Sequence, residues 1–69
     1  MCIAFILRRL QCDWPFLIAS NRDEISAREC TKPARHWVDR KNIRGGLDHQ
    51  AGGTWLALND NGVMAIVLN

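Results

Sequence analysis

The dipeptide Asn61-Gly62 constrains the fold more than any other local feature, because it separates two short apolar segments. Asn-Gly favours a type I′ turn, in which both central residues have positive φ, and this turn closes a two-residue β-hairpin loop. The sequence therefore predicts an antiparallel hairpin formed by residues 53–60 and 62–69, with Asp60 opposite Val63.

A two-residue loop also predicts which side chains share a face of this hairpin. The expected pairs are Leu58–Ala65 and Leu56–Val67 on one face, and Ala57–Ile66 and Trp55–Leu68 on the other. Both faces are apolar, whereas an antiparallel sheet with one face in water alternates apolar and polar residues. We therefore expect a further layer on each side of this sheet.

Two more apolar segments, residues 2–8 and 14–20, are also predicted to be strands with apolar residues on both faces. If residues 9–13 close a hairpin between them, the start of the first strand lies beside the end of the second. Cys2 is then expected within a residue or two of residues 20–23.

The segment between the hairpins, residues 24–52, is polar and is predicted to be irregular. Lys32-Pro33-Ala34 should be extended, and the pairs Gly45-Gly46 and Gly52-Gly53 permit tight turns or close backbone approach. No segment has the length and capping residues of a helix that could cover a sheet face. The chain of 69 residues therefore lacks the layers that its strands require.

Composition and charge exclude several classes of function. The formal charge is +2 with scattered basic residues, which argues against nucleic-acid binding. No apolar run approaches the roughly 18 residues of a membrane span, and the apolar start of the chain is too short and wrongly flanked for a signal peptide. Three cysteines are an odd number without a disulfide framework, which favours a reducing, cytoplasmic location.

The cysteines and histidines do not have the spacing of metal ligands. There is no C-x-x-C motif and no histidine pair at helical spacing, so we expect no metal site and no covalently attached haem. The residues concerned are Cys2, Cys12, Cys30, His36 and His49. The three tryptophans, Trp14, Trp37 and Trp55, are interpreted as packing residues.

Cys2 is the strongest candidate for chemistry. The initiator Met1 is normally removed when the next residue is small, which would leave Cys2 with a free α-amine beside its thiol. An α-amine has a pKa of about 8, so it can act as general base for the thiol of the same residue. The alternative interpretation is a small buried apolar residue at the start of a strand.

The polar cluster Asn21-Arg22-Asp23-Glu24 directly follows the second apolar segment. In the expected hairpin, Arg22 would stabilise the Cys2 thiolate and Asp23 would accept a hydrogen bond from the α-amine. Asn21 would orient a substrate carbonyl or an oxyanion. The alternative is a solvated strand end, where Arg22 and Glu24 form an exposed ion pair of little energetic weight.

Several sequence blocks occur together in a specific order. They are Met1-Cys2, Asn21-Arg22-Asp23-Glu24, Lys32-Pro33-Ala34 with Trp37, Gly46-x-Asp48 before Ala51-Gly52-Gly53-Thr54-Trp55-Leu56, and Asn59 to Asn69. Over essentially all 69 residues the sequence resembles the NRDE-motif family, that of transport and Golgi organisation protein 2. It departs at Glu29-Cys30, where an Arg-Pro step is usual in the family. Family members are several times longer, so the resemblance implies that residues 1–69 are the N-terminal part of a single, incomplete domain.

The resemblance implies an α+β fold. The expected domain is an N-terminal nucleophile (Ntn) hydrolase-like αββα sandwich, of which this chain supplies mainly antiparallel β-hairpins. Cys2 matches the position of the nucleophile. Distant relatives, such as choloylglycine hydrolases and penicillin V acylases, follow this cysteine with R-x-x-D. Here Arg22 and Asp23 are adjacent, so the correspondence rests on Asp23 more than on Arg22.

The resemblance implies an amidohydrolase without a cofactor that cleaves a small amide C–N bond, with Cys2, Asp23, Arg22 and Asn21 in its site. Two alternatives stay open. The first is a non-catalytic carrier of haem or another small molecule, since eukaryotic family members are implicated in haem trafficking and in membrane and lipid homeostasis. Cys2, His36 or His49 would then contact haem. The second is an inactive fragment.

Overall fold

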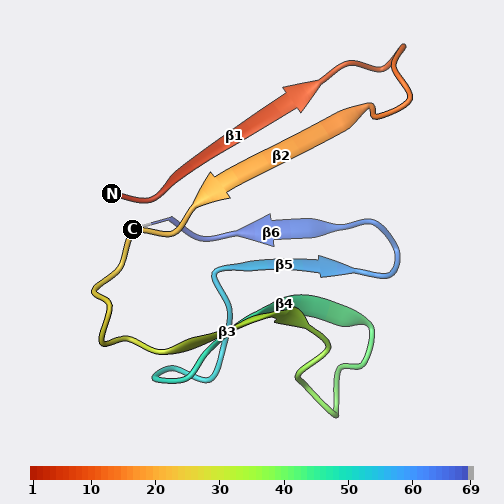
Figure 1. The fold of residues 1–69 in the computed structure, drawn as a ribbon. Helices are drawn as coiled ribbons and strands as arrows, with labels where there is room; N and C mark the ends of the chain where they lie inside the picture. Colours follow the sequence, from red (N-terminus) through yellow and green to blue (C-terminus); the bar gives the residue numbers. More distant parts are fainter. Residues whose placement is uncertain (69) are drawn as a thin grey trace.

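The computed structural model describes residues 1–68, which form two antiparallel sheets (Figure 1). The strands are β1 (Ile3–Arg8), β2 (Phe16–Asn21), β3 (Cys30–Ala34), β4 (Ile43–Asp48), β5 (Leu56–Asn59) and β6 (Met64–Ile66). The first sheet pairs β1 with β2, and the second has the order β3-β4-β5-β6. The predicted antiparallel hairpins are therefore confirmed, and no helix occurs among residues 1–68.

The first hairpin forms in the predicted place. Its register runs from Ile3 opposite Asn21 to Arg8 opposite Phe16. The Arg9 amide donates to the Pro15 carbonyl oxygen at 2.8 Å and closes the connection. The second strand begins later than expected, because Pro15 lacks an N–H group and lies in this connection.

The hairpin at Asn61-Gly62 also forms, but its register is one residue away from the predicted one. The observed pairs are Leu56–Ile66, Ala57–Ala65 and Leu58–Met64. The loop contains three residues rather than two, because the Asn59 amide donates to the Val63 carbonyl oxygen at 2.9 Å. The predicted two-residue turn is therefore wrong, and the expected end of this hairpin at Asn69 lies outside the described residues.

The side chain of Asn59 explains the longer loop. Its Oδ1 accepts hydrogen bonds from the amides of Asn61 and Val63, each at 2.9 Å. Among the described residues only glycines have positive φ, so Asn61 does not adopt the conformation that a type I′ turn needs. Gly62, with φ of +82°, supplies the single left-handed residue of this three-residue loop.

Residues 24–52 contain two strands, β3 and β4, so the prediction of an irregular segment is wrong there. β3 includes the extended Lys32-Pro33-Ala34, and its pairing with β4 shifts register between Thr31 and Ala34. In β4 the buried positions are Gly45, Gly46 and Asp48, so apolar alternation is not visible in the sequence. The glycine pair serves close approach, as expected: a Cβ at Gly45 would lie 2.7 Å from the Leu56 carbonyl oxygen.

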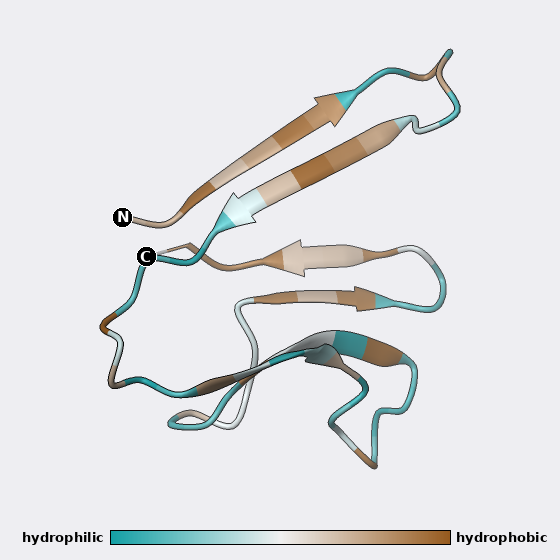
Figure 2. Ribbon diagram, in the orientation of Figure 1, coloured by the Kyte–Doolittle hydropathy of each residue, from teal (hydrophilic) through white to brown (hydrophobic). Residues whose placement is uncertain are grey.

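The apolar side chains of both sheets remain largely in contact with solvent. No hydrophobic side chain is buried among residues 1–68, and Phe5 is 69% exposed. The surface of 5706 Å² exceeds the about 4,400 Å² expected for a compact protein of this mass. The radius of gyration of 13.3 Å likewise exceeds about 11 Å. Figure 2 shows the apolar stretches of β1 and β2. Both faces of the first hairpin are therefore apolar and open.

Residues 1–68 include no helix long and apolar enough to cross a membrane.

Candidate functional site

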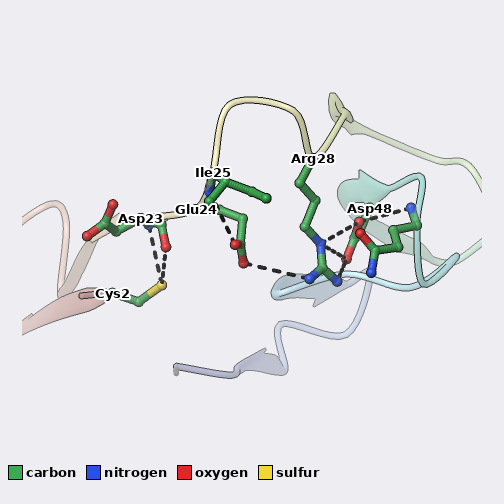
Figure 3. Close-up of polar contacts among 7 residues, drawn as sticks. Cys2, Asp23, Glu24, Ile25, Arg28 and Asp48 are labelled. Carbon is green, nitrogen blue, oxygen red and sulfur yellow. Dashed lines mark hydrogen bonds and ion pairs between the residues drawn. The ribbon is translucent and has the colours of Figure 1, made fainter.

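Cys2 lies against the end of β2, as the sequence predicted. Ile3 pairs with Asn21, so the residue before β1 faces the residues after β2. The Asp23 amide donates to Cys2 Sγ at 3.4 Å, and Sγ lies 3.8 Å from the Asp23 carbonyl oxygen (Figure 3). A backbone N–H directed at sulfur interacts favourably with a thiolate.

A cavity of about 220 Å³ opens beside Cys2. Its lining joins the open end of the first hairpin, the following loop and the residues that flank β5 and β6. The lining residues are Cys2, Arg22, Glu24, Arg28, Thr54, Trp55 and Val67. Cys2 is half-buried in this wall, which places its thiol where a small molecule can reach it.

Arg22 lines the cavity together with Cys2, and its guanidinium group contacts the ring of Trp55. Its guanidinium carbon lies 4.4 Å from the centre of the Trp55 ring, within cation–π range. The alternative interpretation of an exposed Arg22–Glu24 ion pair is wrong, because Glu24 pairs with Arg28 instead. Trp55, expected only to pack, is thus part of the candidate site.

Asp23 binds the N-terminal amine of the chain. Its Oδ2 accepts a hydrogen bond from the Met1 ammonium group, and both side chains are exposed. The hydrogen bond raises the pKa of the Met1 amine and lowers the pKa of the Asp23 carboxyl. With Met1 in place, the amine beside Asp23 belongs to Met1 rather than to Cys2.

Asn21 lies at the end of β2 and is exposed. Arg22 lines the cavity with Cys2, and the Asp23 backbone contacts Sγ, whereas Asn21 does not line this cavity. The role of Asn21 stays a prediction.

Sequence reasoning assigned no role to an ion pair that borders the cavity. Arg28 Nη2 donates to Asp48 Oδ2 at 2.5 Å, and Arg28 Nε donates to the same oxygen at 3.1 Å and to Oδ1 at 3.2 Å. Arg28 Nη1 also lies 3.8 Å from Glu24 Oε2 (Figure 3). Asp48 is only 8% exposed. The signal in the sequence was Asp48, which follows the pair Gly45-Gly46 by two residues.

Asp48 also organises the turn that leads to Trp55. Its Oδ1 accepts a hydrogen bond from the Gln50 amide at 3.1 Å, and its carbonyl oxygen accepts one from the Gly52 amide at 2.7 Å. Gly52 has φ of +79°, which glycine adopts without strain. Arg28 and Asp48 thereby connect the loop after Asp23 to the segment that carries the Trp55 ring.

This ion pair predicts a pH dependence of stability. The hydrogen bond from Arg28 holds the pKa of Asp48 below the ordinary carboxyl value of about 3.9. The contribution is therefore fully present above that value and is lost as the pH falls through the lower folded pKa. We expect the free energy of unfolding of the Asp48→Asn variant to be lower than that of the wild type at pH 6 and to change less below about pH 4.

Urea unfolding followed by tryptophan fluorescence at a series of pH values measures this difference. Asp13→Asn is the matched control, because Asp13 is exposed and forms no ion pair within residues 1–68. Parallel pH profiles for wild type and Asp48→Asn would contradict the assignment.

The remaining histidines and cysteines are dispersed. His36 Nε2 lies 3.0 Å from the Lys32 carbonyl oxygen, and His49 Nε2 lies 2.6 Å from Thr31 Oγ1. Within the part of the chain that the structure describes, no group of three histidine, cysteine or acidic residues could hold a metal ion. Neither histidine lines the cavity with Cys2. Haem binding through Cys2, His36 or His49 stays a prediction.

The comparisons with known proteins bear on the whole chain. No curated protein and no solved structure matches it. The family described as Transport and Golgi organisation 2 does match, over residues 1–69. This match confirms the resemblance that was based on the NRDE cluster and the blocks after it. The chain therefore belongs to the Transport and Golgi organisation 2 family.

Proposed function

We propose that the protein is an amidohydrolase that uses an N-terminal cysteine to cleave a small amide C–N bond. The observation that carries the proposal is the position of Cys2: its thiol lines a cavity of about 220 Å³ and receives the Asp23 amide at 3.4 Å. This volume is smaller than the roughly 300 Å³ of typical drug-sized sites, which favours a small substrate.

Removal of Met1 would make Cys2 the first residue, with a free α-amine of its own. In the first step the uncharged amine accepts the thiol proton, and Sγ attacks the amide carbonyl carbon. The C–N bond then breaks, the leaving amine takes the proton, and a thioester remains on Cys2. Water hydrolyses this thioester, which releases the carboxylic acid and regenerates the thiol.

Two neighbours support the reaction in this proposal. Arg22 lines the same cavity, and its positive charge would stabilise the negative charge that develops during the attack on the amide. The Asp23 carboxylate, which holds the Met1 ammonium group in the unprocessed chain, would orient the amine of Cys2 after processing. A nearby carboxylate also raises the pKa of an amine, which makes the amine a stronger base and lowers its uncharged fraction at pH 7.

The proposal extends to the fold. The two antiparallel sheets would form part of an Ntn-hydrolase-like αββα sandwich, within a larger domain that supplies helix layers. Support comes from the open apolar faces of the first hairpin, where Phe5 and Ile6 are 69% and 61% exposed. Burial of such side chains contributes about 1.5–3 kcal/mol each, so uncovered faces forgo a large stabilisation.

Intact-mass spectrometry before and after mild iodoacetamide treatment at pH 7 tests the mechanism. We expect the mature protein to lack Met1, and we expect Cys2 to be alkylated before Cys12 and Cys30. Exposure alone predicts the reverse order, because Cys12 and Cys30 are exposed whereas Cys2 is half-buried. The two other thiols are therefore internal controls. A retained Met1 would exclude the proposed general base.

A further inference from the structure

The cavity beside Cys2 contains two guanidinium groups with different partners. Arg28 donates to both oxygens of Asp48 and also lies 3.8 Å from Glu24, so its donors are engaged by carboxylates. Arg22 forms no side-chain hydrogen bond or ion pair with any of residues 1–68. Its N–H groups are therefore available to a ligand in the cavity.

Trp55 determines where the Arg22 guanidinium lies. The cation lies over the ring, with its carbon 4.4 Å from the ring centre. A guanidinium carries its donors around the edge of its plane, where two of them can bind both oxygens of one carboxylate. The ring in turn packs over Gly46, because a Cβ there would lie 2.5 Å from Trp55 Cζ2.

We propose that Arg22 binds a carboxylate of the substrate, so that the preferred substrates are small amides that carry an anionic group. This inference rests on the proposed hydrolase function and specifies its substrate class. The thiol of Cys2 and the cation of Arg22 line one cavity of about 220 Å³, so a molecule of a few heavy atoms contacts both. Arg22 is thus a specificity-determining residue as well as an electrostatic support for the reaction.

Iodoacetate and iodoacetamide form a matched pair of probes. In both reactions the Cys2 thiolate forms an S–C bond as the C–I bond breaks and iodide leaves, but only iodoacetate carries a carboxylate. We expect the rate ratio of iodoacetate to iodoacetamide at Cys2 to be about tenfold higher in the wild type than in Arg22→Gln, the factor that one charge-assisted hydrogen bond supplies.

Arg44→Gln is the matched control, because it removes the same charge from an exposed position that does not line this cavity. The ratio at Cys2 should be unchanged in this variant, and the ratio at Cys12 should be the same in all three proteins. Equal ratios at Cys2 in wild type and Arg22→Gln, or an equal fall in Arg44→Gln, would overturn the proposal.

A second measurement uses the unaltered protein and does not depend on the folding of a variant. Acetate at millimolar concentration should slow the alkylation of Cys2 by iodoacetamide in a saturable way, whereas acetamide should not. Absence of protection by acetate would also overturn the role of Arg22. A retained Met1 would refute the hydrolase mechanism and leave the carboxylate preference intact, so the two failures are distinguishable.

Discussion

Replacement of Cys2 by alanine is expected to abolish amide hydrolysis, with a fall in kcat on the order of 10³-fold or more. In the proposed mechanism the sulfur of Cys2 forms the covalent bond to the substrate, and no other cysteine among residues 1–68 lines this cavity. Release of free amine from small carboxylate-bearing amides, detected with an amine-reactive dye, measures the effect.

Cys12→Ala and Cys30→Ala are the matched controls, because both thiols are exposed and neither lines the cavity with Cys2. They should retain the wild-type rate. Far-UV circular dichroism verifies that the strands persist in all three variants. Hydrolysis that continues unchanged in Cys2→Ala would show that the activity uses another group and would overturn the proposed mechanism.

Gly45→Ala is expected to lower the free energy of unfolding. A Cβ at this position would lie 2.7 Å from the Leu56 carbonyl oxygen and 2.8 Å from Thr54 Oγ1. The backbone of β5 must move to relieve this contact, which costs about 1–3 kcal/mol.

Gly53→Ala is the control for Gly45→Ala. Nothing lies within 4 Å of a Cβ at Gly53, and its φ is not positive. This substitution should leave the free energy of unfolding unchanged or raise it by up to about 1 kcal/mol, since alanine restricts the unfolded chain. Urea midpoints of the two variants provide the comparison. Equal midpoints would show that β4 and β5 do not approach as closely as the structure indicates.

The first hairpin illustrates what a local pattern predicts well. Two apolar segments separated by a short polar connection specify an antiparallel pair, and this pairing alone brings Cys2 to the end of β2. The second hairpin shows the limit of such reasoning. Asn61-Gly62 correctly indicated a turn, but the loop has three residues instead of two, because the Asn59 side chain accepts hydrogen bonds from two loop amides. A one-residue change in loop length then altered every cross-strand pair.

The strand β4 was missed because its signal is the absence of side chains. Gly45 and Gly46 occupy buried positions, where strand prediction looks for valine or isoleucine. Glycine is needed because the Leu56 backbone and the Trp55 ring occupy the space of a Cβ. That requirement is visible only when β5 and the segment before it are placed beside β4.

The sequence by itself therefore determined the family, the antiparallel hairpins and the adjacency of Cys2 to Arg22 and Asp23, because these depend on motifs and on pairing between neighbouring segments. Only the tertiary structure decided that Arg28 pairs with Asp48, 20 residues away, and that Arg22 lies over the Trp55 ring. The physical reason is that the partner of a charged side chain depends on which distant elements the sheets bring within reach. In this chain that difference separates an engaged guanidinium from one that is available to a ligand.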